Sequence, residues 1–170
     1  MAREAFRNGR FLLALFALAA ALSVAAGCGS SSSGDDEVTI QTGSLSKAEF
    51  IEKADAACEA SRTELEAKLR KYFQDHEEEV GKADKEDEFF SGMLETVIAP
   101  NFEAEIQRIS SFGAPKDYAP EAAAFLNSLQ RQIEEAHSDI SKLEDSRFPF
   151  EESAKAAKKA GMQGCSESFG

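Results

Sequence analysis

The chain has 170 residues and is acidic, with 31 Asp and Glu against 19 Lys and Arg and a formal net charge of −12 at pH 7. Nucleic-acid binding needs clustered cationic side chains that displace counterions from phosphates, so this composition argues against it. The length after any leader is that of one domain with one core.

Residues 1–27 have the order of a secretory signal peptide. Three arginines within the first ten residues form a basic region, residues 11–22 are apolar, and small residues at 25–27 end the segment. Counted from 11 to 26, the apolar run of about 16 residues is shorter than the ~20 that span a bilayer, which favours a cleaved leader over a permanent anchor. A plain secreted protein and an uncleaved signal anchor are the alternatives.

The end of this leader resembles the lipobox of bacterial lipoproteins, in which small residues precede a cysteine that receives lipid. That cysteine is Cys28 here, and Ala25 stands where the lipobox usually has leucine. The resemblance implies cleavage before Cys28 and its acylation with two or three chains such as palmitate. More than one acyl chain gives stable anchoring, so we expect an extracytoplasmic protein tethered to the cell membrane.

Residues 28–45 are predicted to be the lipidated cysteine and a flexible tether. Gly and Ser dominate residues 29–34 and three acidic residues follow, and such a composition cannot bury apolar surface. We therefore expect one folded domain at 46–170.

The domain is predicted to be all-α, an antiparallel bundle of three long helices plus a short C-terminal helix, because no segment keeps a strand-like alternation. The first helix should run from about 47 to 73 or a little beyond, since Ser46 and Glu49 form a capping-box signature. Its apolar residues then recur at helical spacing.

The second helix should begin near 84–86 and end at Gly113, with apolar residues in phase throughout. Pro100 interrupts it and removes one backbone donor. Because the apolar stripe keeps its phase through that site, we predict one helix kinked at Pro100.

The third helix should start at Pro120 and carry its stripe as far as Leu143. Residues 145–149 are predicted to be a turn, and residues 150–160 the short fourth helix.

Three cysteines are an odd number for an exported protein, but acylation of Cys28 leaves the pair Cys58 and Cys165. Outside the cytoplasm this pair should oxidise, and closing so long a loop would stabilise the fold by roughly 4 to 5 kcal/mol. Two buried free thiols are the alternative.

Three short motifs look similar to those of poorly characterised extracytoplasmic helical lipoproteins of bacteria. They are residues 55–58, 113–117 and 161–165, the first and last of which end in Cys58 and Cys165. Those lipoproteins carry one cysteine in the first mature helix and another near the end after a glycine. The resemblance implies a helical envelope protein and supplies no activity.

Glu134 and His137 have the Glu-x-x-His spacing that offers two ligands to one metal in ferritin-like bundles. Such a site needs a second copy, and His76, the other histidine, has Phe73 at the corresponding position. A solvated helix face is the favoured interpretation, so no metal or cofactor is predicted.

Phe89, Phe90, Met93 and Phe102 lie near the predicted kink at Pro100. They could line a cavity for an apolar ligand between helices, although aromatic stripes more often belong to a core.

The sequence therefore predicts a non-catalytic interaction or binding module of the cell envelope. Its expected partners are the membrane, through Cys28, and an envelope protein. The alternatives are an envelope hydrolase or metal-dependent enzyme using His137 and nearby carboxylates, and an apolar small-ligand carrier.

Overall fold

The structure, a computed structural model, describes residues 37–82, 85–144 and 150–169. The predicted signal peptide, Cys28, most of the predicted tether and the predicted turn at 145–149 lie outside these residues. Within them the fold is all-α, as predicted, and the pairing of Thr42 with Ala114 is an isolated bridge. The helices are α1 (Lys47–Asp75), α2 (Glu86–Met93), the π-helical η1 (Leu94–Ile98), α3 (Ala99–Ser110), α4 (Ala119–Ser138), α5 (Ser141–Glu144), α6 (Glu151–Ala160) and α7 (Gln163–Ser168).

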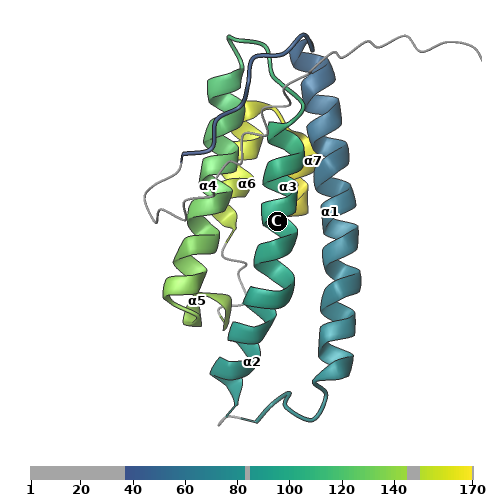
Figure 1. Ribbon diagram of the computed structural model, residues 1–170, viewed down its shortest axis with the longest axis vertical. Helices are drawn as coiled ribbons and strands as arrows, with labels where there is room; N and C mark the ends of the chain where they lie inside the picture. Colours follow the sequence, from purple (N-terminus) through teal and green to yellow (C-terminus); the bar gives the residue numbers. More distant parts are fainter. Residues whose placement is uncertain (1–36, 83–84, 145–149, 170) are drawn as a thin grey trace, which may run out of the picture. The chain divides into compact units, whose positions relative to one another are not determined.

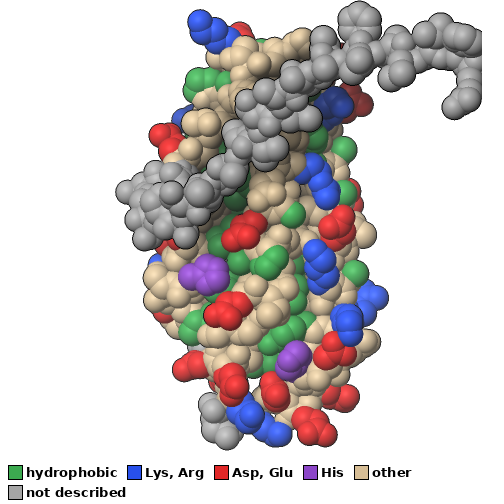
Figure 2. Space-filling model, viewed as in Figure 1, with side chains coloured by type: hydrophobic (Ala, Val, Ile, Leu, Met, Phe, Trp, Pro, Cys, Tyr) green, Lys and Arg blue, Asp and Glu red, His purple; other side chains and the backbone are tan. Residues whose placement is uncertain are grey.

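The helices form a bundle around one core (Figure 1). Helix α1 packs against α3 and α7, and α4 packs against α3 and α6. Helices α6 and α7 also contact each other, so the C-terminal part of the chain joins α4 to α1 across the bundle. Charged side chains of both signs cover much of the outer face, with apolar side chains between them (Figure 2).

The start of α1 confirms the predicted capping box. Glu49 N donates to Ser46 Oγ at 3.3 Å, and Ser46 N donates to Glu49 Oε2 at 2.8 Å. These bonds satisfy backbone donors that a helix start leaves without partners. The helix ends at Asp75, slightly beyond the predicted Phe73.

The second predicted helix is continuous in backbone conformation but contains a π turn. Met93, Leu94 and Ala99 are all right-handed helical, and Ala99 N donates to Leu94 O across the wider turn. Pro100 follows directly and has no N–H to donate to the Thr96 carbonyl. The periodicity predicted the helix, whereas the π turn has no signature in the apolar stripe.

The third predicted helix ends earlier than expected. Helix α4 stops at Ser138, because Asp139 is extended with φ −149° and ψ 92°. Local side-chain bonds compete with the helix here, since Ser138 Oγ donates to Glu135 O and Ser141 Oγ donates to Asp139 Oδ1. The remainder of the predicted stripe continues on the separate α5.

The C-terminal region contains the predicted short helix and one that was not predicted. Helix α6 ends as expected at Gly161, which has φ 86°, a conformation that favours glycine. Helix α7 follows almost at once. Its six residues are too few to show an apolar period, which is why the sequence did not reveal it.

Residues 37–45, named here the N-terminal strap, pack against the helices. Val38 N donates to Asn127 Oδ1 at 2.6 Å, and Asn127 Nδ2 donates to Val38 O at 3.1 Å. Further along, Gly43 N donates to Ala114 O at 2.8 Å, and Ile40 is buried. The packed part of the chain therefore begins at Val38, before the predicted boundary at Ser46.

The strap reaches the loop between α3 and α4 because two glycines meet there. A Cβ atom on Gly43 would lie 2.8 Å from the Gly113 carbonyl carbon. Gly113 also has φ 70°, so both positions need glycine, one for space and one for backbone conformation.

Candidate functional site

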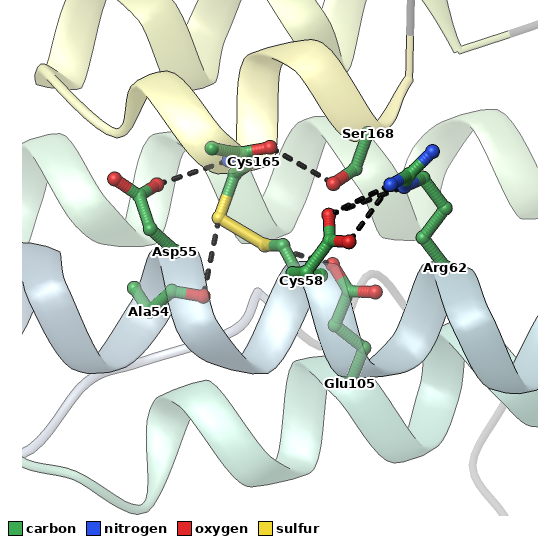
Figure 3. Close-up of a disulfide and its surroundings, with 9 residues drawn as sticks. Ala54, Asp55, Cys58, Arg62, Glu105, Cys165 and Ser168 are labelled. Carbon is green, nitrogen blue, oxygen red and sulfur yellow. Dashed lines mark hydrogen bonds and ion pairs between the residues drawn. A yellow bond between two sulfur atoms is a disulfide. The ribbon is translucent and has the colours of Figure 1, made fainter.

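The two cysteines of the domain are joined in the structure. Cys58 on α1 and Cys165 on α7 form a disulfide with an S–S distance of 2.07 Å and a Cα–Cα distance of 5.0 Å, as the sequence predicted (Figure 3). Both side chains are fully buried. The bond closes a loop between residues 107 positions apart and fixes the C-terminal helix to the first one.

Helix α7 approaches α1 closely at the residue before Cys165. A Cβ atom on Gly164 would lie 2.8 Å from Asp55 Cβ, so glycine is needed there. The approach lets Cys165 N donate to Asp55 Oδ1 at 2.9 Å (Figure 3). Beyond the disulfide, the Phe169 ring lies 5.6 Å from that of Phe102, which fixes the chain end in the core.

Glu105 on α3 lies beside the Cys58 end of the disulfide. Its side chain is nearly fully buried, and its Oε1 lies 3.3 Å from Cys58 Sγ. Burial raises the pKa of Glu105 to about 7, while the hydrogen bond with Ser61 and the charge of Arg108 act to lower it. A disulfide sulfur carries no hydrogen, so this contact is a hydrogen bond when the carboxyl is protonated and donates.

Glu105 belongs to a row of polar side chains between α1 and α3, which we name the polar row: Glu105, Ser61, Asn101 and Lys68. Asn101 Nδ2 donates to Ser61 Oγ at 2.7 Å, and Lys68 Nζ donates to Asn101 Oδ1 at 3.0 Å. Ser61 in turn bonds Glu105. The row therefore connects the half-exposed Lys68 to the buried disulfide through side chains that fix one another.

The sequence interpretation did not single out Asn101 or Glu105. They are four residues apart and four and eight residues after the buried Val97, so they share its inward face. This spacing, which places two polar residues on the apolar face of one helix, is the sequence feature that identifies them.

A second buried polar group, between α4 and α6, has a structural role. Ser153 N donates to Gln132 Oε1 at 2.9 Å, and the hydroxyls of Ser153 and Ser128 lie 3.4 Å apart. The residue before α6, Phe150, supplies no side-chain cap. Gln132 therefore caps α6 from the neighbouring helix.

Glu134 and His137 are both exposed on α4. Glu134 Oε1 accepts from Gln130 Nε2 at 3.1 Å. His76 lies elsewhere, with its ring stacked on Tyr72 at 4.1 Å. Within residues 37–82, 85–144 and 150–169, no group of three or more potential metal-ligating side chains comes together.

The three phenylalanines of the predicted apolar pocket belong to two ring clusters. The Phe89 ring contacts those of Tyr72 and Phe90, at 5.3 and 5.6 Å. The Phe102 ring instead contacts Phe150 at 4.6 Å. A helical rise of about 1.5 Å per residue separates Phe89 from Phe102 by about 20 Å, so the structure does not gather these rings around one position. Met93 is buried on α2 between them in sequence.

No helix in the part of the chain that the structure describes combines the length and apolar character required to cross a membrane. Comparisons with protein-family models, with curated proteins and with solved structures give no match.

Proposed function

We propose that the chain is a lipid-anchored, extracytoplasmic protein that acts as a non-catalytic interaction module in the bacterial cell envelope. The leader at 1–27, followed by Cys28, supports export and acylation. The observation that carries the proposal is the bond between Cys58 and Cys165. It uses the two cysteines that acylation of Cys28 leaves, and such bonds persist outside the cytoplasm.

The N-terminal strap limits how far the domain stands from its anchor. From Cys28 to Val38 the chain can span at most about 35 Å when fully extended. Helix α1, with 29 residues, is about 43 Å long and carries the chain away from the strap (Figure 1). The end where α1 stops and α2 begins, residues 72–82 and 85–90, is named here the distal tip.

The distal tip has the properties of a contact surface for another protein. Phe73 is 42% exposed and Val80 is 49% exposed, and these are the exposed large apolar side chains within the described residues. Exposed acidic residues lie between them, among them Asp75 and Glu77. Apolar anchors beside carboxylates suit a protein partner with a basic, partly apolar surface, whereas anionic lipid headgroups would be repelled.

The anchor is tested by mass spectrometry of the protein extracted from membranes. A Cys28 that is N-terminal and acylated is the expected result, and Cys28→Ser should release the protein from the membrane fraction. A mature chain that begins elsewhere without lipid would refute the anchor.

The interaction role is tested by crosslinking in native envelopes. We expect a discrete crosslinked partner with the parent protein, and a reduced yield with a Phe73→Ser, Val80→Ser double variant. Ala104→Ser, at an exposed site on α3, is the control that should leave the yield unchanged. Equal crosslinking yields from all three proteins would show that the distal tip is not the contact surface. The absence of a crosslinked partner with all three proteins would refute the interaction role.

We also propose the finer architecture, an antiparallel bundle whose second helix bends at Pro100. The π turn directly before Pro100 supports this, since π turns and prolines are the usual causes of helix bends.

A further inference from the structure

We propose that Glu105 is the proton donor and acceptor for Cys58 when a thiol of another molecule opens the Cys58–Cys165 disulfide or when the bond re-forms. This makes the bond a site of pH-dependent thiol–disulfide exchange in addition to a structural link.

The first argument is the asymmetry of the two sulfur atoms. Cys58 Sγ has the Glu105 carboxyl at 3.3 Å, a group that can exchange a proton. Cys165 Sγ instead has the Ala54 carbonyl oxygen at 3.4 Å, which has no proton to give (Figure 3). The environment therefore supports Cys58 as the sulfur that leaves and Cys165 as the sulfur that is attacked.

The second argument is the placement of the two cysteines. Cys58 lies within the long helix α1, whereas Cys165 lies on the six-residue α7 near the chain end. Both are buried, so a reductant reaches the bond only when α7 moves away from α1. A helix of six residues opens more readily than one of 29 residues, which again makes Cys165 the accessible sulfur.

The reaction balances with a thiol as the reductant. The reductant thiolate attacks Cys165 Sγ, forms a mixed disulfide with it and breaks the bond to Cys58 Sγ, which leaves as a thiolate. Glu105 then gives its proton to Cys58, and a carboxylate and a thiol remain. A second reductant thiol resolves the mixed disulfide, so the reductant pair is oxidised to its own disulfide and Cys165 is released as a thiolate. In re-formation, the Glu105 carboxylate takes the proton from Cys58 as it attacks the mixed disulfide.

The polar row holds the carboxyl in place for this step. Asn101 fixes the Ser61 hydroxyl, and Ser61 bonds Glu105. The carboxyl is buried, and its pKa of about 7 leaves it partly protonated at neutral pH, as a proton donor requires.

Arg108 is the charged side chain that acts on Glu105, and the other charged side chains nearby are bonded to partners of their own. On α3, Arg108 faces Glu105 and also lies 3.8 Å from Glu64 of α1. On α1, Arg62 pairs with Glu59 at 2.8 Å. On α7, the exposed Glu167 accepts from Gln163. Asp55 of α1 bonds the Cys165 backbone.

The test is the rate at which dithiothreitol reduces the disulfide of the folded, full-length chain between pH 5.5 and 8.5. The rate is divided by the concentration of dithiothreitol thiolate and by the fraction of molecules in which α7 is open, measured by amide exchange of α7 at each pH. This removes the change in folded-state stability that ionisation of Glu105 itself causes, so that only the chemical step remains. In the parent protein this normalised rate should fall as pH rises through about 7, because Glu105 loses the proton that it donates. Glu105→Gln should show a rate at pH 6 that is about 100-fold lower and independent of pH, since a positioned acid contributes at least about that factor.

Three controls separate proton transfer from a change in folding. Glu103→Gln, at an exposed site on the same helix, should keep the parent profile. Ser61→Ala should shift the midpoint of the profile upward, because the bond it removes lowers the pKa of Glu105. In concentrated guanidinium chloride the parent and Glu105→Gln should react at equal, pH-independent normalised rates.

A parent profile that is flat or rises with pH would overturn the proposal. A Glu105→Gln profile that coincides with the parent profile would overturn it as well. If Glu105→Gln does not fold, the parent profile and the Ser61→Ala shift decide the matter without it.

Discussion

Replacing Glu105 by Gln should make stability less dependent on pH. The folded-state pKa of Glu105 is about 7 and its ordinary value is 4.5. At 1.36 kcal/mol per pKa unit, the folded state favours the protonated carboxyl by about 3 kcal/mol relative to the unfolded chain. Because the folded pKa is raised, this contribution is present in full below pH 4.5 and is lost as pH rises through 7. The parent protein should therefore lose about 3 kcal/mol across this window.

Glu105→Gln keeps the shape and a donor group but has no charge to bury. Its free energy of unfolding should lie close to that of the parent at pH 4 and exceed it by up to about 3 kcal/mol at pH 8. The assay is urea unfolding of the oxidised proteins at several pH values, with the difference between the two proteins plotted against pH. The difference removes every other titrating group. A difference in free energy of unfolding that does not change with pH would show that Glu105 does not remain buried with a raised pKa.

Three further substitutions test other contacts. Removing the disulfide with a Cys58→Ser, Cys165→Ser double variant should lower the free energy of unfolding by roughly 4 to 5 kcal/mol, measured by urea unfolding against the oxidised parent. Gly164→Ala should destabilise the fold by about 1 to 3 kcal/mol, since the added carbon meets α1 at 2.8 Å, and thermal unfolding checks it. Asn127→Ala should remove both bonds to Val38 and speed amide exchange at residues 38–43, with helices α1 and α4 unaffected.

Each of these has a clear contrary result. A double cysteine variant as stable as the parent would mean that the cross-link does not constrain the unfolded chain. An unchanged melting temperature for Gly164→Ala would contradict the close approach of α7 to α1. Protection at residues 38–43 that survives Asn127→Ala would show that Ala114 alone holds the strap.

The sequence predicted the parts of the fold that local chemistry determines. The start of α1 follows from Ser46 and Glu49, which lie within one turn of each other and cap the helix without help from the rest of the chain. The end of α6 follows from Gly161 for the same reason. The pairing of Cys58 with Cys165 followed from the count of cysteines once Cys28 was assigned to acylation.

Features that the apolar spacing does not encode were not predicted. The break at Asp139 comes from side-chain bonds that compete with a helix whose apolar spacing continues. The strap depends on Asn127, which is far away in sequence, and on the contact of Gly43 with Gly113. Glu105 has the spacing of a core residue, but its bond to Ser61 and its contact with Cys58 depend on the packing of α3 against α1.

The attachment of the strap also determines how the domain would respond to mechanical load. A pull on the chain ahead of Val38 would act first on its two bonds to Asn127 and next on those that join residues 41 and 43 to Ala114. Only after these had parted would tension reach the first turn of α1. The strap would thus detach and extend under a force at which the cross-linked helices stay folded.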